Sequence, residues 1–324
     1  MARRTDPRKA IRESELRIHK QIETAWNRLL AANNLDFPHR PVDLMRPGRS
    51  RSIARDAERY LQPWLRLFQE EVAWLGAYSI LWRLKHEPYD SVPIDTRLPF
   101  ELLGVVTNNA TAIYRLVRAG LDYQARAMLR ILFESSSLAL ALLADAELRA
   151  GYIAAIDERD ARHFWQQKLR PAAISSVLND IEANLLLEAP DRAELAAWRK
   201  STYEWLSQFV HPNYVVAIMG GHAWDPRDHR LDLLRPNTLG RCCAGSRSTL
   251  AKAFRLTWYF CVFFYGVASE GFRGAPRFEV APRADVESAM VAMGFEIILS
   301  AGNRWWGINE EEGYDVTDDD SEPA

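Results

Sequence analysis

Apolar residues recur at every third or fourth position along most of this chain, and this spacing predicts helices. Such a period places the apolar side chains on one face of a helix. The first stripe of this kind consists of Ile11, Ile18, Ile22, Ala25 and Leu29. Alternation at every second position, which a half-buried strand requires, is not sustained over a useful length. The pattern therefore predicts an all-α protein, a bundle of about eight to ten helices with no substantial sheet.

Proline and glycine mark where the expected helices begin and end. Pro7 opens the first helix, Pro63 breaks or kinks a long helical stretch, and Gly120 separates two central helices. A link as short as Gly120 favours an antiparallel pair. Residues 219–239 are the least regular segment, and a loop or a small hairpin is expected there. The expected helices span residues 7–32, 52–86, 99–119, 121–144, 146–170, 171 onward, 190–211, 246–272 and 284–304.

The chain has a basic beginning and an acidic end, although its formal net charge is only −2. Residues 1–60 hold 14 Lys/Arg against 8 Asp/Glu, whereas residues 310–324 hold eight acids and no base. The basic part could bind an anionic partner, but a solvated surface is the favoured interpretation. We expect an N-terminal helix with a basic linker over residues 1–50, a main helical domain over 51–304 and an acidic disordered tail over 305–324.

Several classes of protein are disfavoured by the sequence. Cys242, Cys243 and Cys261 form neither a disulfide framework nor a metal spacing, which fits a reducing compartment. The N-terminus lacks the apolar segment of a signal peptide, and the most apolar run, residues 256–268, is shorter than the roughly 20 residues of a membrane span. Motifs for phosphate loops, dinucleotide folds, serine hydrolases and zinc proteases are absent. We predict a cytoplasmic protein that uses no cofactor and no membrane.

Two charged residues interrupt the apolar middle of the helix expected over residues 121–144. Between residues 127 and 143 the only charges are Arg130 and Glu134, and apolar residues surround the helix axis. A helix with this composition is buried on all sides. Arg130 and Glu134 are four residues apart and share a face with Arg126, one turn earlier. Because a desolvated ion must be paired or neutralised, the sequence predicts an inward-facing charged cluster.

Two interpretations of this cluster stay open at this point. In the functional interpretation, Arg130 binds an anionic group, and Glu134 orients that group or acts as an acid or base. In the structural interpretation, the two residues form an ion pair that fixes the register of the helix.

A second polar edge follows later in the chain, where Tyr203, Ser207 and His211 are spaced four residues apart. Proline disfavours helical geometry in the residue before it, so His211, which precedes Pro212, is expected at the C-terminus of a helix. The helix dipole favours a charged imidazole there, and His211 could act as a general acid or base or simply cap the helix. The candidate catalytic residues are Arg130, Glu134 and His211, and the candidate substrate-binding residues are Arg126, Tyr203, Ser207 and Asn213.

Two weaker groups of polar residues are better explained without a function. The first lies in the middle of the helix over residues 99–119 and is expected to form a solvated face. The second lies in the irregular segment, and its spacing matches no defined metal site, so no metal is predicted. The two groups are Thr107, Asn108, Asn109 and Thr111, and His222, Asp225, Asp228 and His229.

The two helix motifs together resemble an uncharacterised bacterial all-helical family, described as a domain of unknown function. The matching stretches are residues 128–134, which contain R-x-x-x-E, and residues 206–212, which contain S-x-x-x-H. The similarity covers roughly residues 100–215. It implies a helical fold and brings no activity with it.

A looser likeness is to the HEPN helical domains of bacterial toxins and defence ribonucleases. Those domains carry an arginine a few residues ahead of a histidine on one helix. In this chain Glu204, Trp205 and Leu206 occupy the positions where that arginine would precede His211. The likeness implies RNA as a substrate in a toxin or phage-defence setting.

Three functional hypotheses follow. The first is a protein that acts on or binds a phosphate-bearing ligand, RNA among the candidates, through Arg130, Glu134 and His211. The second is a non-enzymatic interaction or ligand-sensing protein in which the cluster is a structural ion-pair network. The third is a homo-oligomer whose aromatic C-terminal helices form the interface. The proposed aromatic anchors are Trp258, Tyr259, Phe260, Phe263, Phe264, Tyr265, Trp305 and Trp306.

Overall fold

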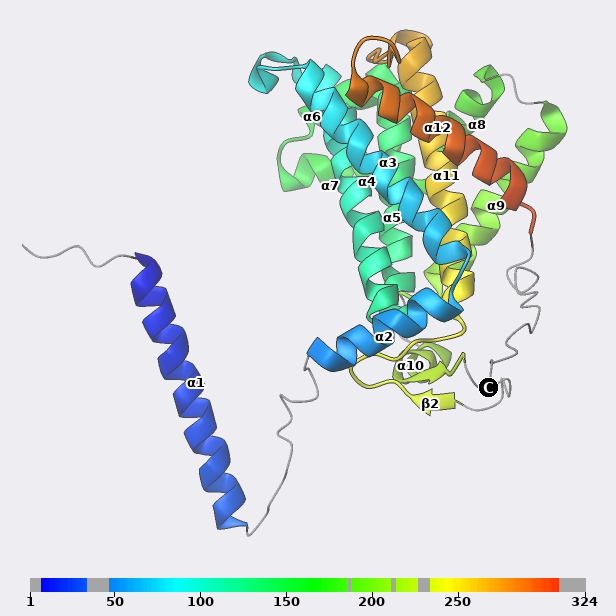
Figure 1. Cartoon of the computed structure of the whole chain (residues 1–324). Coiled ribbons are helices and arrows are strands. Elements are labelled where there is room, and N and C mark those ends of the chain that lie inside the picture. The colour runs from blue at the N-terminus through cyan, green and yellow to red at the C-terminus, as the bar shows by residue number, and fades with distance from the viewer. Residues whose placement is uncertain (1–6, 34–46, 186–187, 211–213, 227–233, 309–324) are drawn as a thin grey trace, which may run out of the picture. The chain divides into compact units, whose positions relative to one another are not determined.

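The computed structural model describes residues 7–33, 47–185, 188–210, 214–226 and 234–308 (Figure 1). The chain divides into two compact units, residues 1–50 and residues 51–324. The described helices and strands are α1 (Pro7–Ala32), α2 (Pro47–Tyr60), α3 (Trp64–Lys85), α4 (Ile94–Arg118), α5 (Asp122–Ala144), α6 (Ala146–Ala154), α7 (Glu158–Lys168), α8 (Pro171–Asn184), α9 (Ala189–Ser207), α10 (Tyr214–Gly221), β1 (His222–Trp224), β2 (Leu234–Pro236), α11 (Ser246–Glu270) and α12 (Val286–Trp305). The predicted all-α class is confirmed, with more helices than expected.

Helix α5 is the central helix of the larger unit and contacts α4, α8, α9 and α11. The expected antiparallel pair of α4 and α5 is present, and Gly120 makes the turn between them with a φ of +73°. This left-handed conformation favours glycine, and a Cβ at this position would collide with the backbone of Arg241. The turn therefore fixes the direction in which α5 enters the core.

Helix α5 also has the length and apolar composition of a membrane-spanning segment, alone among the helices of the described ranges. In the structure most of its apolar stretch is buried inside the bundle. Packing against neighbouring helices explains this composition, so α5 is a core helix. The prediction that it is buried on all sides is wrong, because Ile131 and Glu134 lie on an exposed edge.

Aromatic side chains from α3, α4 and α11 fill the space beside α5. Trp82 of α3 stacks on Phe100 of α4 with ring centroids 4.6 Å apart, and Phe100 meets Phe264 of α11 edge to face at 5.6 Å. Offset stacks and edge contacts of this kind stabilise more than the burial of their area alone. The aromatic residues of α11 therefore belong to the core.

Helix α12 lies along α3 and α11 and is held to them through tryptophan side chains (Figure 1). The indole Nε1 of Trp74 on α3 donates to the Val291 carbonyl at 2.8 Å, and the indole of Trp258 on α11 donates to the Ile298 carbonyl at 3.0 Å. Lys85, at the end of α3, pairs with Asp285, the N-cap of α12. Helix α12 therefore runs antiparallel to α3.

Several boundaries differ from the prediction. Helix α2 begins at Pro47, which was expected in the linker, because proline is compatible with the first turn of a helix. Helix α4 begins at Ile94 and includes Pro99, which is buried in the core. The helix expected over 146–170 is two helices, since the Asp157 carboxylate accepts from the Asp160 amide at 2.8 Å and caps α7.

The segment expected to be a loop or a small hairpin contains a two-stranded antiparallel sheet. Strands β1 and β2 pair with His222 opposite Pro236 and Trp224 opposite Leu234. Residues 227–233, between the strands, lie outside the described residues, and so does most of the acidic tail.

Candidate functional site

Arg130 is buried, as the sequence predicts, and its guanidinium is surrounded by partners. Its Nε donates to Glu134 Oε1 at 2.9 Å, and its Nη1 donates to the Tyr203 carbonyl at 3.1 Å and to Ser207 Oγ at 2.9 Å. The guanidinium carbon also lies 3.5 Å from the centroid of the Tyr203 ring. The cluster thus connects α5 to α9 through both charge-assisted hydrogen bonds and a cation–π contact.

The prediction that Glu134 is buried is wrong. The Glu134 side chain is 57% exposed, whereas the Arg130 side chain is 9% exposed. Residues four apart on a helix differ by about 40° around its axis, so one can lie under a neighbouring helix and the other at its edge. Glu134 therefore forms a partly solvated ion pair with Arg130, and its charge does not need a further partner in the core.

Two of the proposed site residues, His211 and Asn213, lie outside the described residues. Helix α9 ends at Ser207. Tyr203 and Ser207, proposed as substrate-binding residues, instead contact Arg130 through oxygens that accept hydrogen bonds from its guanidinium. The Ser207 hydroxyl in turn donates to the Tyr203 carbonyl at 2.7 Å.

Arg126 belongs to a separate network one turn earlier on α5. Its Nε donates to Asp122 Oδ2 at 2.9 Å and to Thr249 Oγ1 at 3.0 Å, and its Nη2 donates to the Gly245 carbonyl at 3.1 Å. Thr249 also donates to Asp122 Oδ1 at 2.8 Å. Arg126 therefore joins α5 to the start of α11, and the substrate-binding role proposed for it has no support in its contacts.

A third arginine network was not anticipated from the sequence. Arg199 on α9 pairs with Glu182 on α8, whose side chain is fully buried, and it contacts the Tyr259 hydroxyl at 3.3 Å. Tyr259 donates to Glu182 Oε1 at 2.7 Å. Burial raises the pKa of Tyr259 and lowers the pKa of Arg199. The network ties α8, α9 and α11 together in the interior.

Glu71 on α3 is a buried carboxyl group of another kind. Neither carboxyl oxygen has a hydrogen-bond partner, and the side chain is enclosed within the α3–α11 packing. Burial raises the pKa of Glu71 well above its ordinary value. Burial also raises the pKa of the Cys261 thiol, and the nearby Glu71 carboxyl raises it further. Glu71 is therefore neutral over a wider range of pH than an exposed glutamate.

The weaker candidates behave as ordinary structural residues. Thr107 donates to the Leu103 carbonyl at 2.8 Å, and Asn109 donates to Ser135 at 3.0 Å. Asp225 pairs with Arg241 at 3.2 Å. In the part of the chain that the structure describes, no group of three or more His, Cys, Asp or Glu side chains could hold a metal ion.

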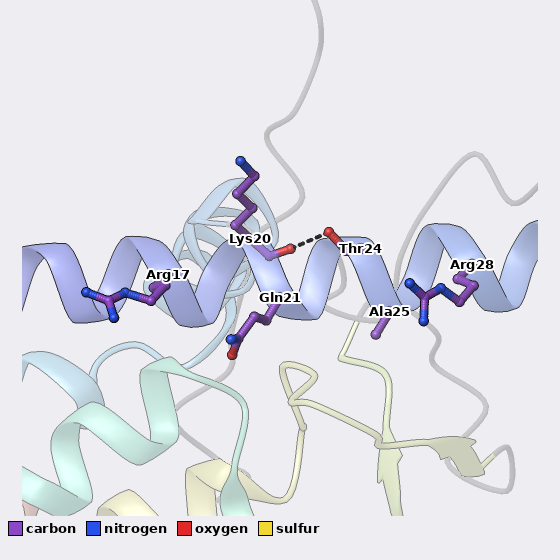
Figure 2. A pocket seen from close by; sticks show the side chains of 6 residues that line it. All are labelled: Arg17, Lys20, Gln21, Thr24, Ala25 and Arg28. Carbon is purple, nitrogen blue, oxygen red and sulfur yellow. Dashed lines mark hydrogen bonds between the residues drawn. The ribbon is translucent and has the colours of Figure 1, made fainter.

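Helix α1, in the smaller unit, presents a basic face. Figure 2 shows Arg17, Lys20 and Arg28 along one side of this helix, with Gln21 and Thr24 between them. The Thr24 hydroxyl donates back to the Lys20 carbonyl at 2.8 Å. A shallow surface pocket on this helix is lined by residues of α1 alone, so it is an open helix face. Its positive charge suits an extended anionic partner.

The larger unit presents an apolar surface that the sequence did not reveal. Large apolar side chains on α12 and on the last turns of α3 are between 52% and 70% exposed. Helices α3 and α12 pack against each other, and the Lys85–Asp285 pair joins the end of α3 to the beginning of α12. We name this surface the α3/α12 stripe. Its residues are Ile80, Leu84, Val286, Met290, Met293 and Ile297.

The aromatic residues proposed as interface anchors do not contribute to that surface. Tyr259, Phe260, Phe263 and Phe264 are buried, and Trp258, Tyr265, Trp305 and Trp306 are partly buried against the core. Their side chains fill the spaces between α3, α11 and α12. An oligomer would therefore need a different surface.

No protein family, curated protein or solved structure matches this chain.

Proposed function

We propose that this chain is a non-enzymatic helical interaction protein whose larger unit docks a partner protein through the α3/α12 stripe. The observation that carries the proposal is the exposure of six large apolar side chains on two helices that pack against each other, α3 and α12. Single exposed apolar residues are common on soluble proteins, but contiguous apolar patches mark binding surfaces. The residues of the stripe belong to helices whose other faces pack into the core, so the positions of these residues are fixed by the fold.

The contacts of Arg130 support this choice over an enzyme that acts on a phosphate-bearing ligand. Its guanidinium already donates to Glu134, Ser207 and the Tyr203 carbonyl, and the Tyr203 ring covers one face of it. A ligand phosphate would have to displace these partners. The arrangement is what a structural ion-pair network requires.

Photo-crosslinking at the stripe tests the proposal directly. A photoreactive amino acid replaces Met293 in the full chain, and a second variant carries it at Glu158, an exposed residue of α7. We expect a discrete covalent adduct from position 293 in cells and none from position 158. If neither position forms an adduct, the proposal is refuted.

RNA binding through α1 is a second candidate function, favoured by the basic face that Arg17, Lys20 and Arg28 form on that helix. Lys and Arg side chains on one face bind phosphates and release counterions, so such binding weakens steeply as salt rises. The likeness to the bacterial helical family and to HEPN domains stays a prediction and adds no activity to either candidate.

Anisotropy of a labelled single-stranded RNA measures this second candidate. Replacement of Arg17, Lys20 and Arg28 by Gln should lower the affinity at least about tenfold and reduce the salt slope by roughly 2. Arg162→Gln, which removes an exposed arginine from α7, is the matched control and should leave binding unchanged. Equal affinity of the triple variant and the control would exclude α1 as the binding helix.

A further inference from the structure

We infer that the acidic segment that follows Ile308 binds, within the same chain, to a row of arginines on α2. The row consists of Arg51, Arg55 and Arg59, and we name it the α2 arginine row. It is a different surface from the α3/α12 stripe, so the inference does not depend on the proposed function. The charge of the row, the place where the acidic segment begins, and the length and charge of that segment support it.

The α2 arginine row is an exposed face of a helix whose other side is packed. Its three arginines are exposed and four residues apart, so about 6 Å separates each from the next along the helix axis. Ile53 and Ala57, on the opposite side of α2, are buried in the core. The fold therefore holds the row in place and turns it toward solvent.

The acidic residues of α2 do not neutralise this row. Glu58 pairs with Arg118 at the end of α4, and Asp56 has an interaction of its own. Among the residues that the structure describes, no carboxylate forms an ion pair with an arginine of the row. Guanidinium groups bind carboxylates through paired charge-assisted hydrogen bonds, so three of them on one face suit an acidic partner.

The acidic segment begins close to the end of α2. Arg255 on α11 donates to the carbonyl of Trp306 at 2.9 Å and to that of Ile308 at 2.6 Å. Arg247 on α11 donates to the carbonyl of Tyr60, the last residue of α2, at 3.0 Å. These two arginines of α11 are eight residues apart, which is about 12 Å along the helix axis. One helix therefore holds both the start of the acidic segment and the end of α2.

A tryptophan contact brings the same two parts of the chain together. Trp305, the last residue of α12, meets Trp64, the first residue of α3, edge to face with ring centroids 5.8 Å apart. The guanidinium carbon of Arg255 lies 5.7 Å from the centroid of the Trp64 ring. Since Trp64 follows α2 by four residues, the acidic segment starts beside the connection between α2 and α3.

The acidic segment has the charge and the length to cover the row. Residues 309–324 hold eight Asp or Glu and no Lys or Arg. A stretch of 16 residues can reach at most about 50–58 Å, whereas the row extends over about 12 Å of α2. Single ion pairs at a surface are weak, but partners in one chain meet at a high effective concentration, so several pairs can form together.

Zero-length crosslinking of the full chain tests the contact. Arg55→Lys keeps the positive charge and supplies an amine that a carbodiimide can couple to a carboxylate in contact with it. All eight acids lie in one tryptic peptide that begins at Trp305, so mass spectrometry identifies the product. Arg162→Lys, at an exposed position of α7, is the matched control. We expect at least about fivefold more product from position 55 than from position 162 in about 0.01 M salt, and its loss in about 1 M salt.

Two further variants test whether the whole row takes part. Addition of Arg51→Gln and Arg59→Gln to the Arg55→Lys chain should lower the yield of this product at least about threefold. Addition of Arg159→Gln and Arg170→Gln, which removes two exposed arginines elsewhere, should leave the yield unchanged. All these positions are exposed, so the melting temperature should stay that of the parent in each variant.

A mixture of isotope-labelled and unlabelled Arg55→Lys chains separates contact within one chain from contact between copies. We expect crosslinked peptides in which both halves carry the same label. Equal amounts of mixed pairs would assign the row to the acidic segment of a second copy and overturn the inference. A yield no higher than that of Arg162→Lys, or one that survives the loss of Arg51 and Arg59, would leave the row to an external anion and overturn it as well.

Discussion

Arg130 on α5 donates to the hydroxyl of Ser207 on α9 across 2.9 Å, although the two residues are 77 positions apart in the chain. This bond, with the contact between Arg130 and the Tyr203 backbone, joins the central helix to a peripheral one. The cluster that the sequence marked as a candidate site is therefore a link between two helices.

Loss of this link should destabilise the fold. Arg130→Ala removes charge-assisted hydrogen bonds and leaves the partly buried Ser207 hydroxyl and Tyr203 carbonyl with fewer partners. We expect the free energy of unfolding to fall by about 2–4 kcal/mol, measured by urea denaturation followed by circular dichroism. Glu134→Gln, which alters the exposed partner, should cost less than about 1 kcal/mol.

An enzyme hypothesis makes the opposite prediction for the same variant. If Arg130 serves a substrate, Arg130→Ala keeps its stability and loses only activity. Equal unfolding free energies for Arg130→Ala and the parent would therefore contradict the structural role.

The pair of Arg199 and Glu182 should be more sensitive to single changes than to a double change. Arg199→Leu leaves the fully buried Glu182 carboxylate without its cation, and we expect a loss of about 3–5 kcal/mol in the free energy of unfolding. The double variant Arg199→Leu with Glu182→Leu should recover most of this loss, because apolar replacements need no partner. A double-mutant cycle in urea measures the coupling, and additive losses would show that the pair is not coupled.

Glu71 gives the stability of the chain a defined pH dependence. Its folded-state pKa is raised by burial, so its contribution is fully present below its unfolded pKa near 4.5 and is lost as the pH rises toward the folded-state pKa. Glu71→Gln should remove this dependence, so the variant should gain stability relative to the parent as the pH rises. Denaturation at several pH values above 4.5 checks this, with Glu70→Gln as the neighbouring exposed control. If the stability advantage of Glu71→Gln over the parent shrinks as the pH rises, the raised pKa of Glu71 is contradicted.

Gly302 allows α12 to approach α11. A Cβ at this position would overlap the Trp258 indole, which donates to α12 one turn earlier. Gly302→Ala should therefore lower the free energy of unfolding by about 1–3 kcal/mol, whereas Gly307→Ala, with nothing nearby, should not. Thermal melts of the two variants compare them, and equal melting temperatures would show that Trp258 moves aside freely.

Features that depend on short-range spacing could be predicted from the sequence. Gly120 was correctly placed between two antiparallel helices, and Pro63 lies at the break before α3. The burial of Arg130 followed from the apolar residues on both sides of it along α5. These predictions rest on interactions within a few residues, which a sequence displays directly.

Features that depend on which helices meet could not be predicted in the same way. Arg199 and Glu182 are 17 positions apart on two helices, and each looks like an ordinary surface charge in its own amphipathic segment. Val286 and Met290 look like core residues, because a helix that is apolar on several sides does not reveal which side is covered. Only the tertiary arrangement shows which side chains of different helices contact each other.

The two indole bonds to Val291 and Ile298 hold α12 at two points along its length. A helix fixed at two points cannot rotate about its own axis, so its outward residues keep their position before any partner arrives. Association then loses little conformational entropy, since the surface is pre-organised. Substitutions on that surface should consequently act on how fast a complex comes apart and leave the rate of encounter nearly unchanged.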